Sequence, residues 1–286
     1  MTKLTIGICV YDDYDGAYFT LQSLRLHNRD IIDRLEFVII NNNPNSNEGK
    51  ALYNYKNWIK EPLSYIEYDN FSSTALRDKI FGLANTEYVL VMDCHVLLAN
   101  GSLKKLLDYY DSGKDKGNLL HGPLLYDDLE GYSTHFDLSV WGSHMWGQWA
   151  CDPRAESKNS KPFEIEGMGL GLFTCRKDSW LGFNDKFRGF GGEEGYIHEK
   201  YRRAGKKVMC LPFLRWNHRF DRPGGVPYTN DLKDRFRNYM IGHHEIEKDT
   251  SIVVDQLYKD STSKSVLPYV IPADFIEKVK NELKIK

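Results

Sequence analysis

Asp93 and His95 stand two residues apart at the end of the apolar run 88–92, where they offer a metal ion one oxygen and one nitrogen. A carboxylate and an imidazole at the point where a chain leaves a buried strand can turn toward one divalent ion. His218 is a candidate third ligand from a distant segment. Polar residues often finish a strand, and a lone histidine is more often bonded to the backbone than to a metal. Each of these signals is therefore weak when taken alone.

Two adjacent carboxylates, Glu193 and Glu194, follow Gly191 and Gly192 at the start of an expected helix. Glycines let a substrate approach the backbone closely, and the helix dipole favours negative charge at the helix N-terminus. One carboxylate in this position can act as a general base while the other binds hydroxyl groups. An acidic helix cap is the competing interpretation of the same four residues.

The elements that must position these groups alternate between strand and helix over the first hundred residues. Short apolar runs rich in β-branched residues predict buried strands, and apolar residues at helical spacing predict helices. The expected strands are 4–10, 37–40, 64–68, 88–92 and 208–211, and the expected helices are 17–27, 73–83, 101–110 and 196–204. This alternation predicts an α/β fold with a mostly parallel sheet, helices on both faces and a site at the carboxyl ends of the strands. Residues 121–165 are expected to be rich in loops.

Composition places the chain among ordinary globular proteins. The 286 residues are 41% hydrophobic and carry a net charge of −2, so overall charge does not indicate a polyanionic partner. The five scattered cysteines form no CxxC pair, which argues against a disulfide framework or a zinc knuckle. We found neither a run of eighteen apolar residues nor a signal-peptide pattern, and we therefore expect a soluble cytoplasmic protein without a membrane span.

The three motifs in their chain order resemble those of the GT-A glycosyltransferases. Asp-x-His at a strand end, a GGE helix start and a late histidine followed by an arginine are similar to the motifs of the polypeptide N-acetylgalactosaminyltransferases. The acidic segment is also similar to that of the β-1,4-galactosyltransferases. The likeness covers roughly residues 3–230 and is most specific over Gly167–Arg222. It implies a Rossmann-like GT-A domain over 1–245, with a nucleotide-binding half (1–98) and an acceptor and catalytic half (99–245). Residues 246–286 are expected to form a C-terminal helical extension.

The resemblance also implies roles for single residues. Asp93, His95 and His218 match the ligands of Mn²⁺ (or Mg²⁺), although the spacing from His218 to Arg222 is one residue longer than in the family. The segment Phe190–Glu194 matches the WGGEN or WGGED segment beside the donor sugar, with phenylalanine in place of tryptophan. The residues expected to bind the nucleotide-sugar are Val10, Tyr11, Asp12, Asn41, Asn43, Arg77, Asp93, Gly191, Gly192, Arg222 and Tyr228.

The implied donor is a nucleotide-sugar, and a UDP-sugar is the favoured one. Asn41 and Asn43 stand where the family often has an aspartate, but an amide can also bond a pyrimidine edge. A divalent ion would neutralise the diphosphate leaving group. Arg222 and Tyr228 would add donors from the loop 223–227, which resembles a closing lid as much as a plain surface turn.

The stereochemical outcome depends on Glu194. Retaining relatives have a neutral asparagine at this position and inverting relatives have an aspartate base. The acidic Glu194 favours inversion with this residue as the base, and Glu193 is then expected to bind hydroxyl groups of the sugar or the acceptor. Two alternatives stay open. One is a retaining enzyme like the N-acetylgalactosaminyltransferases, and the other is a catalytically silent module that binds a nucleotide-sugar or a nucleic acid.

The acceptor is less defined by the sequence. Trp141, Trp146 and Trp149 could stack on a sugar or a base, or they could simply pack over the donor pocket. Residues 199–240 contain eleven Lys and Arg against four Asp and Glu. This charge is either a solvated face or a field that steers an anionic substrate. A protein, a glycan and hydroxymethylated DNA are the candidate acceptors. DNA is conceivable because soluble viral transferases in infected cells modify it, and duplex DNA would require base flipping.

Overall fold

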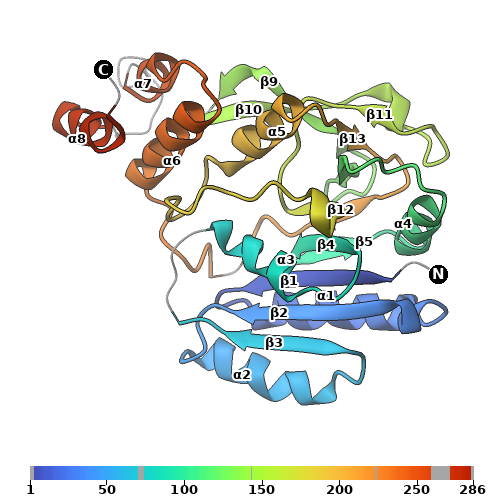
Figure 1. The fold of residues 1–286 in the computed structure, drawn as a ribbon. Coiled ribbons are helices and arrows are strands. Elements are labelled where there is room, and N and C mark those ends of the chain that lie inside the picture. Colours follow the sequence, from blue (N-terminus) through green and yellow to red (C-terminus); the bar gives the residue numbers. More distant parts are fainter. Residues whose placement is uncertain (1–2, 70–73, 143, 223, 259–270, 285–286) are drawn as a thin grey trace.

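A central sheet runs through the protein in a computed structural model that describes residues 3–69, 74–142, 144–222, 224–258 and 271–284 (Figure 1). Its strands are β1 (Leu4–Val10), β2 (Leu35–Asn41), β3 (Leu63–Glu67), β4 (Tyr88–Asp93), β6 (Leu119–His121), β11 (Phe163–Glu164), β12 (Leu172–Arg176) and β13 (Val208–Cys210). They are ordered β11-β13-β6-β12-β4-β1-β2-β3. The α/β fold class expected from the sequence is confirmed, and so is the position of each expected strand to within about three residues.

The two halves of the sheet differ in strand direction. In one half β1, β2, β3 and β4 are all parallel. In the other half β12 runs antiparallel to both β4 and β6, and β11 runs antiparallel to β13. The parallel half therefore brings the carboxyl ends of β1, β2 and β4 to one edge, which is where ligands bind in open α/β sheets.

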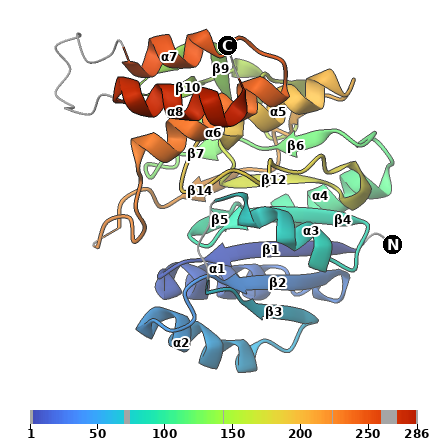
Figure 2. The same cartoon turned by 60° about the vertical axis from the view of Figure 1, so that its left-hand side comes forward.

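Helices cover both faces of this sheet (Figures 1 and 2). They are α1 (Tyr14–His27), α2 (Asn47–Tyr55), α3 (Asp78–Leu83), α4 (Ser102–Asp111), α5 (Glu193–Arg203) and α6 (Leu232–Glu245). The helix expected over 73–83 is a 3₁₀ turn, Thr74–Arg77, followed by α3, and Ser73 lies outside the described residues. Helix α1 begins three residues earlier than expected because Asp13 caps it, accepting a hydrogen bond from the Gly16 N–H at 3.1 Å.

A smaller four-stranded sheet brings distant segments together beside the end of β4. Its strands are β5 (Val96–Leu98), β7 (Leu124–Leu125), β8 (Tyr132–Ser133) and β14 (Trp216–His218), in the order β5-β14-β7-β8. Strand β14 is antiparallel to β5, with His218 opposite Val96. This register places His218 next to His95 although the two residues are far apart in the sequence.

The stretch 121–165 is more regular than the expected loop. Besides β7, β8 and β11 it contains an antiparallel hairpin of β9 (His135–Gly142) and β10 (Met145–Ala150). Aromatic side chains favour strands because they pack well on a pleated surface. The prediction of a loop-rich stretch overlooked this preference, since the tryptophans of the stretch lie on the hairpin.

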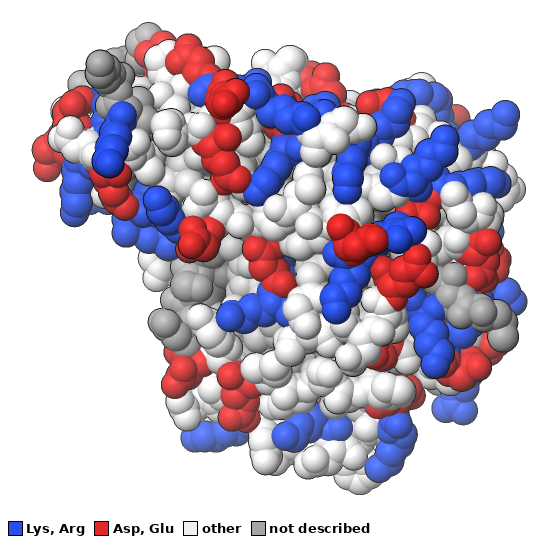
Figure 3. Space-filling view, viewed as in Figure 1, with Lys and Arg blue, Asp and Glu red and all other residues white. Residues whose placement is uncertain are grey.

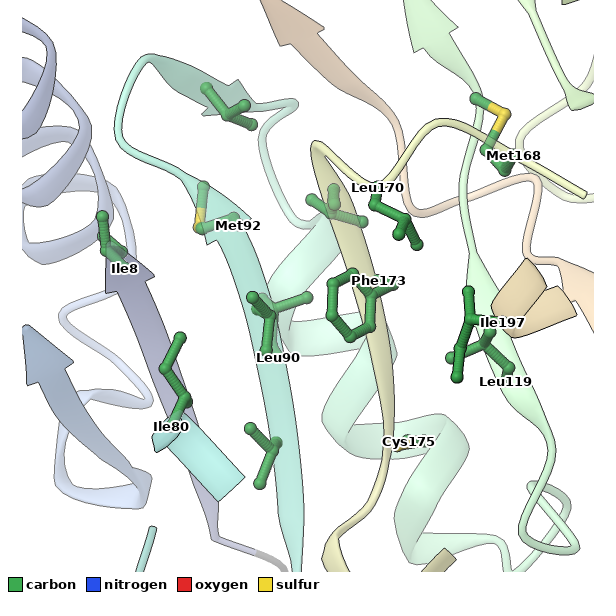
Figure 4. Packing of buried hydrophobic residues seen from close by; sticks show 14 of the residues in the cluster. Ile8, Ile80, Leu90, Met92, Leu119, Met168, Leu170, Phe173, Cys175 and Ile197 are labelled. Atoms are coloured by element: carbon green, nitrogen blue, oxygen red, sulfur yellow. The ribbon is translucent and has the colours of Figure 1, made fainter. Parts of the chain in front are cut away.

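Apolar side chains from both faces of the sheet fix the strand ends in place (Figure 4). Ile8, Leu90 and Phe173 are fully buried on β1, β4 and β12, and Ile80 of α3 packs closely over Gly7. Burial of such side chains is worth roughly 1.5–3 kcal/mol each. This burial anchors the strands, so the loops at the strand ends can carry polar groups and still keep a defined position.

The C-terminal extension packs on α6 (Figure 1). It contains α7 (Ser251–Tyr258) and α8 (Ala273–Leu283). Arg237 of α6 donates to Glu282 of α8 at 2.5 Å, and the rings of Phe236 and Phe275 lie 6.2 Å apart. In the described parts of the chain, helices long and apolar enough to cross a membrane are absent.

Candidate functional site

A cavity opens at the carboxyl ends of β1 and β4, the edge of the sheet predicted to carry a site. It contains about 620 Å³ of space free of protein atoms, part of it open to solvent. The residues that line it come from six separate segments of the chain and include seven of the predicted site residues. They are Cys9, Val10, Tyr11, Asp13, Asn42, Thr74, Leu76, Arg77, Asp93, Cys94, His95, Phe190, Arg222 and Tyr228.

The three predicted metal ligands lie together beside this cavity. The Nε2 atoms of His95 and His218 are 3.1 Å apart, and His218 Nε2 is 3.5 Å from an Asp93 carboxylate oxygen. One ligand atom from each residue falls within 4.8 Å of the others. Strand β4 supplies Asp93, the tight turn after it supplies His95, and β14 supplies His218.

Buried charge surrounds Asp93. Burial would raise the pKa of this carboxyl, but the Arg77 guanidinium and the hydrogen bond with His218 outweigh it and hold the pKa well below its usual range. Arg77 is buried and lies 3.5 Å from Asp93, and one of its terminal nitrogens has no hydrogen-bond partner among the described residues. Glu193 and Glu194 also act on Arg77 electrostatically. Arg77 therefore pairs with Asp93 and also feels the negative charge of the acidic helix start.

These donor atoms fit a divalent cation. Two nitrogens and one carboxylate oxygen form a mixed donor set that suits first-row transition ions. Two ligand atoms that each lie about 2.1 Å from one ion, at a right angle, are about 3.0 Å apart. The observed separation of the two Nε2 atoms, 3.1 Å, is close to this value.

Asp13 is a part of the site that the sequence reasoning missed. One of its carboxylate oxygens lies 2.8 Å from His95 Nδ1, and the side chain is almost entirely buried. Burial would raise the pKa of Asp13, but the hydrogen bond and charge of His95 together with Arg219 keep it well below its usual range. The residue also caps α1, and a helix cap was the only signal that could have indicated it.

The turn before α5 places the acidic pair. Gly191 and Gly192 have φ angles of 92° and 97°, which favour glycine, and a Cβ on Gly192 would lie 2.8 Å from the Cβ of Asn238. The Asn238 amide donates to the carbonyl of Gly191 at 2.8 Å. Helix α6 thus fixes the turn, and Glu193 and Glu194 form the first turn of α5.

The two carboxylates have different environments. Glu193 is buried and accepts a hydrogen bond from the Thr74 hydroxyl at 2.5 Å. Its other oxygen is buried without a hydrogen-bond partner among the described residues. Glu194 is partly exposed, and burial together with the charge of Glu193 raises its pKa to about 8. The pair therefore combines a fixed carboxylate with one that can exchange a proton near neutral pH.

Directly after β2, the cavity wall contains Asn42, which lies between the predicted residues Asn41 and Asn43. The Asn41 amide is turned inward and donates to the Gly49 carbonyl and the Tyr65 hydroxyl. Asn43 donates to Asp12 at 2.8 Å. Asn42 lines the cavity instead, and its buried side-chain oxygen has no hydrogen-bond partner in the described structure. Sequence reasoning chose the positions on either side of Asn42.

Aromatic and basic residues close the cavity opposite β1. The ring of Tyr228 lies 6.2 Å from that of Tyr11 and 5.5 Å from that of Phe190. Arg222 donates to Asp13 at 3.3 Å, and Arg219 donates to the other oxygen of the same carboxylate at 2.8 Å. The predicted residues Val10, Tyr11, Arg222 and Tyr228 are thus brought together at the cavity. Pro223 lies outside the described residues.

The three tryptophans lie on the hairpin β9–β10, and the set of described residues around the cavity does not include them. Trp146 is buried, packs on Gly195 of α5 and donates to the Leu138 carbonyl at 2.8 Å. Trp141 stacks on Trp146, and Trp149 meets Phe136 edge to face. Trp146 therefore supports the helix that carries the acidic pair.

The basic stretch 199–240 is largely paired with acids. Lys200 donates to Glu245, Arg202 and Arg203 pair with Glu199, and Lys207 pairs with Glu164. On the face seen in Figure 3 basic and acidic side chains are interspersed. These contacts favour the solvated-face interpretation for α5, whereas Arg219 and Arg222 belong to the site.

Comparison with known proteins agrees with this geometry. The sequence profile described as glycosyl transferase family 2 matches residues 5–155, which is more than half of the chain. The chain belongs to this family. A comparison with curated protein sequences finds no significant match. The family match covers β1 to β4, α1 to α4 and the Asp93–His95 turn.

Solved glycosyltransferases share the GT-A fold of this family member. GalNAc-T7, solved with UDP, GalNAc and Mn²⁺, matches 100% of this chain with a TM-score of 0.69 at 16% identity. The chain spans 55% of the length of that protein. S. aureus TarS 1–349 in complex with UDP-GlcNAc matches 99% of this chain, and 76% of its own length is covered, with a TM-score of 0.53 at 13% identity. The resemblance to GT-A enzymes of the GalNAc-transferase type is thereby confirmed at the level of the fold.

Proposed function

We propose that this family 2 protein is a metal-dependent glycosyltransferase that moves a sugar from a nucleotide-sugar to an acceptor hydroxyl. The observation that carries the proposal is the convergence of Asp93, His95 and His218 with Arg77 beside one cavity at the strand ends. A UDP-sugar is the favoured donor, because the crystals of GalNAc-T7 and TarS with this fold hold UDP or UDP-GlcNAc. We assign the transferase domain to residues 1–245, with its donor half in 1–98 and its acceptor half in 99–245, and the helical extension to 246–286.

Asp93, His95 and His218 would hold Mn²⁺ or Mg²⁺. A bound ion of this kind neutralises the charge that grows on a departing diphosphate. Arg222 offers guanidinium hydrogens to the same diphosphate from the cavity wall, and Tyr228 adds a hydroxyl. Asn42 and Tyr11 face the remaining space, where an amide and an aromatic ring suit a nucleobase. Asp12, Asn41 and Asn43 hold the backbone of this corner.

Glu194 is the proposed general base of an inverting transfer. It would take the proton from the acceptor hydroxyl as that oxygen attacks the anomeric carbon and the nucleoside diphosphate leaves. Its raised pKa suits proton transfer near neutral pH. Glu193, held by Thr74, would bind hydroxyl groups, and the turn at Gly191 and Gly192 would border the sugar. NMR of the product decides this point, since a retained anomeric configuration contradicts the assignment.

A protein, a glycan or hydroxymethylated DNA remain the proposed acceptors. The ion pairs along α5 weaken the case for a nucleic-acid surface there. Trp141 and Trp149, on the hairpin beside α5, are the proposed acceptor contacts, while Trp146 has a packing role in addition. Transfer to a glycan or a peptide without transfer to hydroxymethylated DNA would eliminate the DNA interpretation.

A donor panel tests the proposal. Nucleotide-sugars with different bases and sugars are incubated with the full chain and Mn²⁺, and release of the nucleoside diphosphate is measured. We expect slow hydrolysis of one or more UDP-sugars that depends on Mn²⁺ and is lost in Asp93→Asn. A catalytically silent module would bind UDP without releasing it from UDP-sugars. Absence of both binding and hydrolysis over the whole panel would contradict the proposal.

A further inference from the structure

Asp13 accepts hydrogen bonds from four groups at the edge of the cavity. Its Oδ2 is 2.8 Å from His95 Nδ1 and 3.3 Å from Arg222, and its Oδ1 accepts from Arg219 at 2.8 Å and from the Gly16 N–H at 3.1 Å. Its relative exposure is 7%. One buried carboxylate thus contacts a candidate metal ligand, two arginines and the first turn of α1.

The contact with His95 selects which imidazole nitrogen faces the metal site. A carboxylate can only accept, so Nδ1 of His95 must carry the proton of this hydrogen bond. In the neutral ring Nε2 then keeps its lone pair, and this is the nitrogen that lies 3.1 Å from His218 Nε2. A metal-binding histidine commonly donates its other N–H to a carboxylate, which fixes the tautomer and the ring orientation.

The contacts with the arginines offset part of the positive charge beside the cavity. Arg219 and Arg222 together bring two positive charges, and Asp13 brings one negative charge. Arg222 also approaches His95 Nδ1 to 3.4 Å, but both groups donate, so they converge on Asp13 rather than on each other. Removal of the carboxylate would leave two guanidinium groups close to an imidazole N–H with no common acceptor.

We propose that Asp13 is a positioning residue that fixes Nε2 of His95 as the metal-binding nitrogen and holds Arg219 and Arg222 at the cavity edge. This role rests on the proposed function, because it serves the metal and diphosphate sites assigned there. It is not a catalytic role, since Asp13 acts through His95 and the arginines.

The first test is the tautomer of His95, which needs no metal. NMR of protein labelled with ¹⁵N-histidine is recorded at pH 8 without divalent ions, and His95→Gln assigns the signals. We expect the Nδ1–H tautomer in the unmodified protein and a shift toward Nε2–H in Asp13→Ala. An Nε2–H tautomer in the unmodified protein, or the same tautomer in both proteins, would overturn the proposal.

The second test is the affinity for Mn²⁺, measured by electron paramagnetic resonance with Asp13→Asn. Asparagine is also a good N-cap, so this variant should keep α1 while losing the negative charge. We expect Mn²⁺ to bind about 10–100-fold more weakly. Asp15→Asn is the matched control, because Asp15 is an exposed carboxylate in the same helix turn, and it should bind like the unmodified protein.

The two proposals fail in different ways. Equal Mn²⁺ affinity in Asp13→Asn and the unmodified protein would overturn the role of Asp13, even if His218→Ala loses the ion as the proposed function requires. If the unmodified protein binds no Mn²⁺, the metal-dependent function fails, and the tautomer of His95 still decides whether Asp13 orients this ring.

Discussion

The rate of sugar transfer should rise with pH through the ionisation of Glu194. Burial and the charge of Glu193 raise the pKa of this carboxyl to about 8. A general base works in its deprotonated form. With a pKa near 8, roughly one tenth of the groups are deprotonated at pH 7 and roughly nine tenths at pH 9. We therefore expect kcat/KM for the acceptor, which reports the enzyme before the acceptor binds, to increase about tenfold over this range.

Two substitutions separate Glu194 from other titrating groups. Glu194→Gln should lower kcat/KM by about 10²–10⁴-fold and abolish the rise. Glu193→Gln should move the midpoint of the profile to lower pH, because it removes a neighbouring charge that raises the pKa of Glu194. Glu199→Gln is the matched control on the same helix, since Glu199 pairs with Arg202 and Arg203 and should give the original profile.

The assay is an initial-rate measurement of nucleoside diphosphate release between pH 6 and 9, with the donor that the panel identifies. The reasoning would be refuted by a profile that is flat between pH 7 and 9, or by a rise that persists unchanged in Glu194→Gln. A midpoint that does not move in Glu193→Gln would refute the electrostatic part of the explanation alone.

Further predictions concern the elements that support the site. Gly192→Ala should destabilise the protein by about 1–3 kcal/mol in urea unfolding, because it forces a Cβ into a positive-φ turn 2.8 Å from the Cβ of Asn238; an unchanged midpoint would contradict this packing. Gly82→Ala is its control, since that helical position is open and alanine should be neutral or stabilising there. Leu90→Ala should cost about 2–5 kcal/mol, because the side chain is fully buried on β4; a cost below 1 kcal/mol would show that the core around Phe173 closes over the gap.

The sequence was sufficient to predict the parallel half of the sheet and the three candidate metal ligands. Buried strands have strong apolar runs, so β1, β2 and β4 were predictable, and Asp93 and His95 follow directly from the end of β4. The contact with His218 was predicted through the family resemblance. The physical cause of this contact is the pairing of β14 with β5, and nothing in the local sequence of either strand indicates that the two pair.

Asp13 and Asn42 were missed for different physical reasons. Asp13 caps α1, and a helix-cap signal in the sequence does not indicate that residues from distant segments, such as His95 and Arg219, also contact the carboxylate. Asn42 belongs to a run of asparagines after β2. Successive residues of an extended chain point to opposite faces, so Asn41 turns toward Tyr65 and Asn42 toward the cavity, but the sequence alone did not show which face holds the ligand.

The most direct test of the central claim is a calorimetric titration of the protein with UDP, carried out once in the presence of Mn²⁺ and once in the presence of EDTA. We predict binding that is at least tenfold tighter with Mn²⁺, and loss of this difference in His218→Ala, whose side chain supplies the ligand from β14. Asp15→Asn should behave like the unmodified protein. Binding of UDP that is equally tight in EDTA, or Mn²⁺-dependent binding that survives unchanged in His218→Ala, would contradict the account of the site.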